Sequence, residues 1–127
     1  MTDEAFDKGL AQRRAMFGSA GAEEQLDAAT DFTRPLQEWV TKQCFGEAWQ
    51  RPVFDARMRS LLTLAMLVAT GRSHEVKIHT RGAIANGVTK EEIRELLMHA
   101  IIYCGVPMAV EGFRSAGEVL RDLELEP

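Results

Sequence analysis

The stretch TKEEIRELLMHAIIYC, residues 89–104, decides the fold class, because it carries both a helix start and a long helical apolar stripe. Thr89 and Glu92 form a capping box, in which the Thr hydroxyl accepts from an orphan N–H and the Glu side chain reaches back. Apolar residues then recur on one helical face: Ile93, Leu96, Leu97, Ala100, Ile101 and Cys104. The pattern predicts an α-helix whose apolar face lies in the core.

The rest of the chain follows the same helical periodicity, with Gly and Pro between periodic segments and few strand signals. We predict further helices over residues 3–17, 23–29, 33–45, 56–70, 73–86 and 107–123, with Thr33, Asp55 and Ser73 as N-caps. Residues 46–52 are expected to be a connector with one helical turn at most. The fold class predicted is therefore all-α, a single-domain helical bundle of about six or seven helices over residues 1–127.

Composition and charge exclude several classes of protein. The 127 residues carry 15 Lys and Arg against 19 Asp and Glu, whereas a nucleic-acid binder would want a basic face. The longest apolar run, residues 61–69, is about half as long as a membrane-spanning helix. The first ten residues carry acidic side chains, where a secretory signal peptide needs basic ones. Cys44 and Cys104 are too few for a disulfide scaffold. We expect a cytoplasmic protein that binds neither nucleic acid nor membrane.

The apolar run at residues 61–69, LLTLAMLVA, has a second consequence, because it is apolar nearly all round the predicted helix. Such a helix is either buried on several sides, or buried on one side and covered by another subunit on the other.

The candidate chemistry centres on Arg72, Glu75 and His79, whose spacing of i, i+3 and i+7 places them on one helical face. A Glu one turn before a His can orient the imidazole ring and raise its basicity, which leaves the other nitrogen free for proton transfer. The Arg side chain adds a fork that binds carboxylates. A solvated face with an incidental ion pair remains an alternative. The His spacing does not favour a metal site.

Other candidate residues have equally simple structural interpretations. His99 and Tyr103 stand at i and i+4, and they could face a pocket or form a boundary His–Tyr contact. Cys104 ends the apolar stripe and is expected to pack as a small hydrophobe. Trp49 in the connector could cap the core, line a pocket mouth or lie at a subunit contact.

Three segments together resemble the carboxymuconolactone decarboxylase family: residues 45–52, FGEAWQRP; residues 59–89, which include Arg72-x-x-Glu75-x3-His79-x-Arg81; and residues 91–107, which end in YCGVP. The resemblance covers nearly the whole chain in the same order. It implies an alkylhydroperoxidase-like helical fold and a homo-oligomer, a trimer or hexamer. Thiol relatives carry Cys-x-x-Cys in this frame, and without these thiols a thiol peroxidase is disfavoured.

The resemblance implies cofactor-independent decarboxylation of 4-carboxymuconolactone to 3-oxoadipate enol-lactone, a step of aromatic-compound degradation by the β-ketoadipate pathway. No cofactor or metal is expected, because the conjugated lactone takes up the electron pair itself. His79, backed by Glu75, would donate the proton to carbon. His99 or Tyr103 would stabilise the charge that grows on the lactone oxygen. The side chains expected to hold the small anionic lactone are those of Arg72, Arg59, Arg81, Arg51, Tyr103, Cys104 and Trp49.

One departure from the family pattern keeps other functions open. Where the family carries histidines after Gly-Val-Pro, this sequence has Glu111 and Arg114. A related acid is therefore also a candidate substrate. The alternatives are a lactone hydrolase or isomerase with a Glu75–His79 proton relay, or an oligomeric helical protein without catalytic activity.

Overall fold

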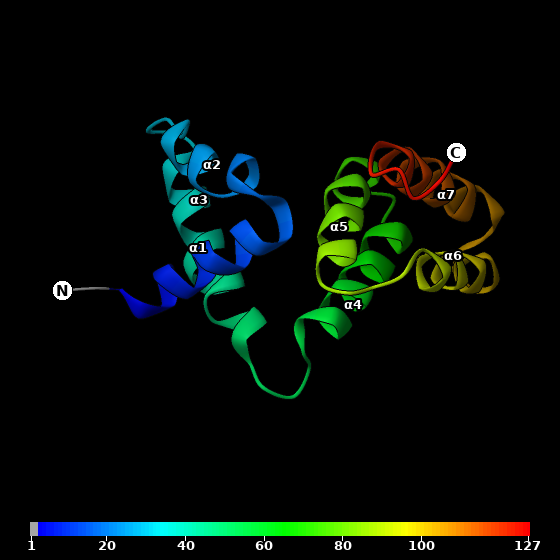
Figure 1. The fold of residues 1–127 in the computed structure, drawn as a ribbon, viewed down its shortest axis with the longest axis horizontal. Helices are drawn as coiled ribbons and strands as arrows, with labels where there is room; N and C mark the ends of the chain where they lie inside the picture. The colour runs from blue at the N-terminus through cyan, green and yellow to red at the C-terminus, as the bar shows by residue number, and fades with distance from the viewer. Residues whose placement is uncertain (1–2) are drawn as a thin grey trace. The chain divides into compact units, whose positions relative to one another are not determined.

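The computed structural model describes residues 3–127, and its regular secondary structure is helical throughout (Figure 1). The described residues form seven α-helices and shorter helical turns without a strand, which confirms the all-α prediction. The chain divides into two compact units, with the boundary between residues 55 and 56. The single domain predicted over residues 1–127 stays a prediction.

The first unit consists of α1 (Glu4–Phe17), η1 (Ser19–Gly21), α2 (Glu23–Asp27), α3 (Arg34–Trp39), η2 (Val40–Phe45) and η3 (Ala48–Gln50). The long helix α1 packs along η2. Asp3 caps α1 by accepting a hydrogen bond from the Phe6 N–H, and Gly18 ends it with φ +72°. A buried guanidinium then ties the unit together, because Arg13 donates to Gly21 O, Gln37 Oε1 and Thr41 Oγ1.

The helix predicted over residues 33–45 changes its winding midway. It is α-helical to Trp39 and continues as the π-helix η2 to Phe45. The buried Thr41 hydroxyl donates to the Gln37 carbonyl at 2.7 Å and accepts from Arg13 at 2.9 Å. Local side-chain bonds of this kind compete with the regular backbone ladder. Thr33 stands at the N-cap position, but its side chain accepts from the Thr30 N–H and makes no capping bond to the helix.

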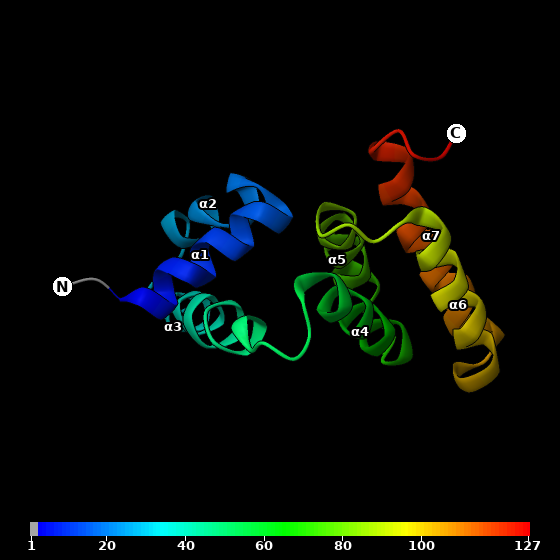
Figure 2. The same cartoon turned by 60° about the horizontal axis from the view of Figure 1, so that its bottom comes forward.

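The second unit contains α4 (Ala56–Ala69), α5 (Ser73–Ala85), α6 (Lys90–Cys104) and α7 (Val106–Asp122). Helix α7 packs on both α5 and α6, and α4 packs on the same two helices (Figure 2). The core comprises Leu64, Val68, Val76, Ala83, Val88, Ile93, Leu97, Ala100 and Ala116. The apolar stripe of residues 93–104 is confirmed, since Ile93, Leu97 and Ala100 are buried and Leu96 and Cys104 pack against the core.

Two predicted helix ends of this unit are present and a third lies one residue earlier than predicted, while the predicted Asp55 N-cap stays a prediction. The capping box of Thr89 and Glu92 is present, and Gly87 with φ +91° follows the end of α5. The prediction that Ser73 caps α5 is wrong. The Arg72 carbonyl already accepts from the Val76 N–H at 2.9 Å, so the N-cap lies one residue earlier, and Ser73 is the first helical residue.

Helix α4 is buried on one side and exposes apolar side chains on the other. Ser60, Leu64 and Val68 are buried, whereas Met66 is 65 % exposed. Coverage of the exposed side by another subunit stays a prediction. Among the described helices, none combines the length and apolar character that a membrane crossing requires.

Candidate active site on helix α5

Helix α5 and its N-cap place Arg72, Glu75 and His79 along one edge of the helix. At about 100° per residue, the three directions fall within about 60° of one another. This edge adjoins the buried face formed by Val76 and Thr80. His79 is half-buried, while Arg72 and Glu75 are exposed. An imidazole at the border of the core, with a carboxylate one turn before it, is the arrangement that the spacing predicted.

Burial and charge act on His79 in opposite directions. Burial lowers the pKa of His79 from its ordinary value of 6.5, and the negative charge of Glu75 raises it. Burial is the larger effect, because desolvation disfavours the charged imidazolium. A lowered pKa makes the imidazolium a stronger acid and the neutral ring the dominant form at neutral pH. Both properties suit a general acid that donates a proton and is then protonated again from solvent.

Replacing Glu75 by Gln should lower the pKa of His79 further, because the raising charge is lost and burial remains. If protonated His79 is the acid, kcat/KM falls as pH rises through its pKa, with a midpoint below 6.5. The midpoint should therefore move to lower pH in Glu75→Gln. NMR titration of the His79 ring and a pH–rate profile measure both quantities. Glu118→Gln, which removes the partner of Lys77, is the matched control and should leave the midpoint in place. An upward shift in Glu75→Gln contradicts the coupling.

The other predicted arginines lie at different positions in the second unit. Arg81 is exposed and lies about 200° round α5 from His79, on the opposite side of the helix. Arg59 is half-buried on α4, which packs on α5. Its neighbour Ser60 accepts a hydrogen bond from Asn86 just after α5 at 3.0 Å. Of these two arginines, Arg59 thus lies on the helix that packs on α5, whereas Arg81 faces away from His79.

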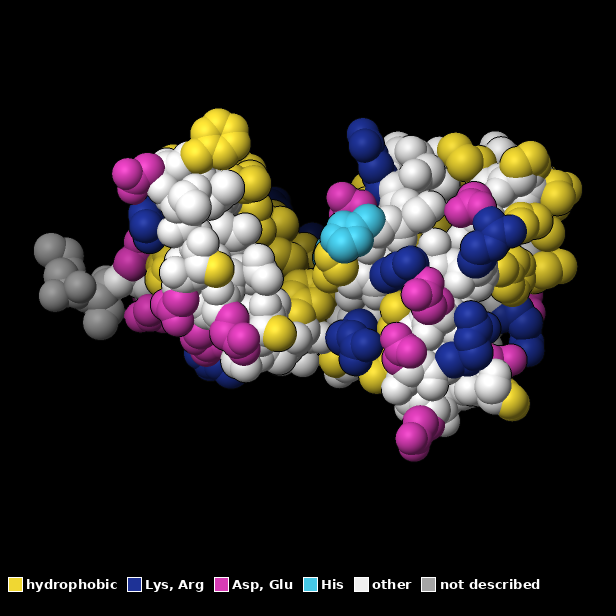
Figure 3. Space-filling model, turned by 90° about the horizontal axis from the view of Figure 1, so that it is seen from above, with side chains coloured by type: hydrophobic (Ala, Val, Ile, Leu, Met, Phe, Trp, Pro, Cys, Tyr) yellow, Lys and Arg dark blue, Asp and Glu magenta, His cyan; other side chains and the backbone are white. Residues whose placement is uncertain are grey.

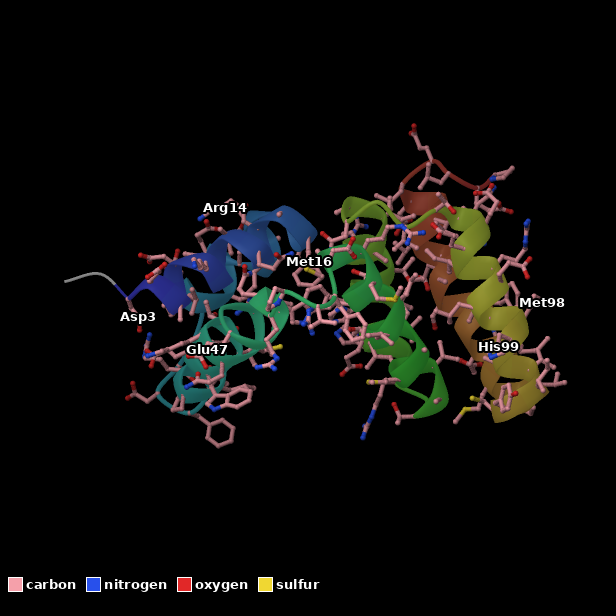
Figure 4. The ribbon with its side chains drawn as sticks, turned by 90° about the horizontal axis from the view of Figure 1, so that it is seen from below. Asp3, Arg14, Met16, Glu47, Met98 and His99 are labelled. Atoms are coloured by element: carbon pink, nitrogen blue, oxygen red, sulfur yellow. The ribbon has the colours of Figure 1, made fainter. Side chains whose placement is uncertain are left out.

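His99 and Tyr103 form a pair on α6. Their ring centroids are 5.0 Å apart with the planes tilted by 48°. Both are exposed, Tyr103 to 77 %, and Figure 4 shows His99 and Met98 on α6. Helix α6 packs mainly on α4 and α7, whereas His79 lies on α5. Cys104 is half-buried against the core, which agrees with its interpretation as a small hydrophobe.

Trp49 and Arg51 belong to the first unit. The Trp49 ring lies 5.4 Å from that of Phe45, which contacts the Phe17 ring edge-on at 5.9 Å. Trp49 therefore packs on the aromatic core of this unit, while Arg51 is exposed just after η3. Their participation in substrate binding stays a prediction.

Sequence reasoning missed a neighbourhood between α5 and α7. Arg72 and Glu111 line the same shallow depression, together with Met108. Glu111 also forms an ion pair with Arg114 on α7. The two positions that depart from the family pattern thus lie on one helix, and one of them adjoins the arginine at the start of α5. No local pattern could have shown this, because Arg72 and Glu111 are far apart in the sequence.

Within residues 3–127, no three His, Cys, Asp or Glu side chains come together in a way that could hold a metal ion. Both cysteines are free thiols and belong to different units.

Comparison with known proteins gives a consistent result. The profile of the carboxymuconolactone decarboxylase family matches residues 34–118. A nitrosuccinic acid decarboxylase of Metarhizium robertsii is 44% identical over 118 residues, which cover 93% of this chain and 82% of the relative. A 4-carboxymuconolactone decarboxylase of Acinetobacter baylyi is 36% identical over 128 residues, which cover 100% of this chain and 96% of the relative. An uncharacterised 15.0 kDa protein of Paracoccus denitrificans is 30% identical over 84 residues, 65% of this chain and 63% of the relative.

Proposed function

Because the chain belongs to the carboxymuconolactone decarboxylase family, we propose that it is an enzyme that decarboxylates a small carboxylated substrate, with His79 at the reacting centre. The observation that carries the proposal is the half-buried His79, whose pKa is lowered by burial and raised in part by the charge of Glu75. Support comes from two relatives, both named as decarboxylases and both aligned with most of the chain.

The substrates in those two names share one chemical property, since each can accept the electron pair that decarboxylation releases. In 4-carboxymuconolactone, the ring carbon that loses its carboxylate is linked to the lactone carbonyl through the ring alkene, which carries the electron pair to the carbonyl oxygen. In nitrosuccinic acid, the carboxylate sits on the carbon that bears the nitro group. The bond to the carboxyl carbon breaks and CO2 leaves. The electron pair moves to the lactone or nitro oxygens. A proton then adds to carbon: in the lactone to the ring carbon next to the carbonyl, which gives the enol-lactone, and in the nitro acid to the carbon that bears the nitro group. We therefore propose a cofactor-independent reaction.

Three tasks follow for the protein. His79 delivers the proton to carbon, with Glu75 keeping its pKa from falling further. Arg72 binds a carboxylate that stays on the substrate. A hydrogen-bond donor must stabilise the negative charge on the lactone or nitro oxygen, and Arg59, His99 and Tyr103 are the candidates.

The substrate proposal is tested by incubating the purified chain with 4-carboxymuconolactone and, separately, with nitrosuccinate. The lactone implies a place in the β-ketoadipate pathway, whereas 44% identity to the nitrosuccinate enzyme favours the nitro acid. CO2 release above the rate without enzyme on either substrate supports the proposal. A folded protein that accelerates neither reaction contradicts it.

Replacing Arg72 by Ala should raise KM about tenfold and leave kcat nearly unchanged, because a remote carboxylate is held equally in the ground and transition states. Steady-state kinetics on the better substrate measure both constants. Lys77→Ala is the matched control, since it also removes one positive charge from α5 but faces Glu118. A fall in kcat at unchanged KM would instead place Arg72 at the reacting atoms.

We also propose that the enzyme is cytoplasmic and that it is a homo-oligomer, a trimer or hexamer. Apolar side chains gather at the end of the second unit where α6 turns into α7, on the right in Figure 3. The exposed members there are Met98, Ile102, Tyr103, Val106 and Val110. An exposed patch of this kind is typical of a surface that another protein covers. His99 and Tyr103 lie on this part of α6, so subunit contact would bury them. A monomeric mass in sedimentation equilibrium would contradict the proposal.

A further inference from the structure

A groove of about 310 Å³ lies between the first half of α6 and the second half of α7. Its apolar floor includes Ile93, Leu97 and Ala116, all of them buried. Its rim carries three cations, Lys90, Arg94 and Arg121. None of its lining residues comes from α5, so it is separate from the candidate active site.

The rim already holds one carboxylate. Lys90 Nζ lies 3.0 Å from Glu126 Oε2 and 3.0 Å from the Leu125 carbonyl oxygen. The C-terminal tail therefore places its own anion at one end of the groove, since Glu126 also lines it. An internal carboxylate on this rim indicates which kind of group the site accepts.

The two arginines are less fully neutralised than Lys90. Arg94 forms a long ion pair with the exposed Glu95 next to it, at 3.8 Å. The Arg121 guanidinium lies 3.4 Å from the position that a Cβ on Gly117 would take. Glu118 is the acidic residue that interacts electrostatically with Arg121. A glycine at this position leaves space above the groove, where a side chain would otherwise meet the guanidinium.

We propose that this groove binds a small organic acid with an apolar body. Its carboxylate pairs with the guanidinium groups of Arg94 and Arg121, and its apolar body covers the floor. A planar guanidinium binds a carboxylate through paired hydrogen bonds, which favours a carboxylate over other small groups. Ligand pockets in proteins typically have volumes of about 300–1,000 Å³. The volume of this groove lies at the lower end of that range, which suits a small ligand. Glu126, which pairs with Lys90, adds a negative charge to the same rim.

Benzoate is the probe, because it combines one carboxylate with a flat apolar ring. It is titrated into the full-length protein while backbone amide NMR shifts are followed residue by residue. We expect saturable shifts concentrated in residues 90–97 and 113–121, while benzamide, which has the same shape without the charge, leaves them unchanged. Because the shifts are assigned residue by residue, binding in this groove is distinguished from binding at the candidate active site on α5. The result therefore does not depend on whether the chain is a decarboxylase.

Arg121→Gln should weaken benzoate binding about tenfold, the effect of losing one charge-assisted hydrogen bond. Arg94→Gln should do the same, which keeps the test decisive if one variant fails to fold. Glu126→Gln should tighten binding, because a negative charge that repels the ligand carboxylate is lost from the rim and Lys90 is released. Lys8→Gln, which removes a cation that pairs with Glu4 on α1 in the first unit, is the matched control and should change nothing. Shifts scattered over the surface, equal binding of benzamide, or unchanged affinity in both arginine variants would overturn the proposal, as would acetate binding as tightly as benzoate.

Discussion

Replacing His79 by Ala is expected to lower kcat of decarboxylation by about 10²–10⁴-fold, the usual contribution of a positioned general acid. The reason is that a carbon of the substrate must take up a proton after CO2 leaves, and the His79 imidazole is the half-buried titratable group on the candidate edge of α5. Single-turnover measurements of CO2 release and of product formation separate loss of chemistry from loss of binding.

The matched control for this variant is His74→Ala. His74 is exposed and lies about 140° round α5 from His79, so its loss removes an imidazole from the same helix without touching the candidate edge. It should leave kcat unchanged. A second variant, His79→Gln, keeps a polar side chain of similar length. In this variant kcat/KM should no longer show the fall with rising pH whose midpoint lies below 6.5. If His79→Ala retains full activity, the proton comes from another group, and the decarboxylase proposal survives without this residue.

Replacing Gly9 by Ala is expected to destabilise the first unit by about 3 kcal/mol, at the upper end of the cost of overpacking. A Cβ at this position would lie 1.7 Å from the Thr41 carbonyl oxygen and 2.9 Å from the Gly46 backbone nitrogen. Because both neighbours are backbone atoms, α1 and η2 would have to separate. Helix propensity alone predicts the opposite sign, since Ala favours a helix over Gly by about 1 kcal/mol.

The measurement uses the two tryptophans, Trp39 and Trp49, which both lie in the first unit. Their fluorescence during denaturant unfolding reports on the first unit even if the second unfolds separately. Gly117→Ala on α7 is the matched control, followed by circular dichroism. Its nearest contact is the end of the flexible Arg121 side chain at 3.4 Å, so this variant should be neutral or slightly stabilising. A Gly9→Ala protein as stable as the parent would show that α1 and η2 are not held in close contact.

Much of the candidate site could be predicted from the sequence, because its geometry is local to one helix. The spacing of Arg72, Glu75 and His79 determines their directions round α5, and the structure places them along one edge beside the buried face. The pKa of His79 could not be predicted, because burial depends on what packs against the helix. For the same reason the outward position of His99 and Tyr103 could not be seen, since their spacing determines only that they share a face of α6.

The amino-acid sequence by itself determined the helices, most of their ends and their apolar faces. Capping side chains, glycines with positive φ and a period of 3.6 residues act within a few positions of the chain, as at Thr89, Gly87 and the stripe from Ile93 to Cys104. Only the tertiary structure decided which faces meet. The backbone contact at Gly9, the depression shared by Arg72 and Glu111, and the cationic groove between α6 and α7 all join residues distant in the chain. Periodicity sets a direction round each helix, whereas the packing of whole helices sets the distance to the next.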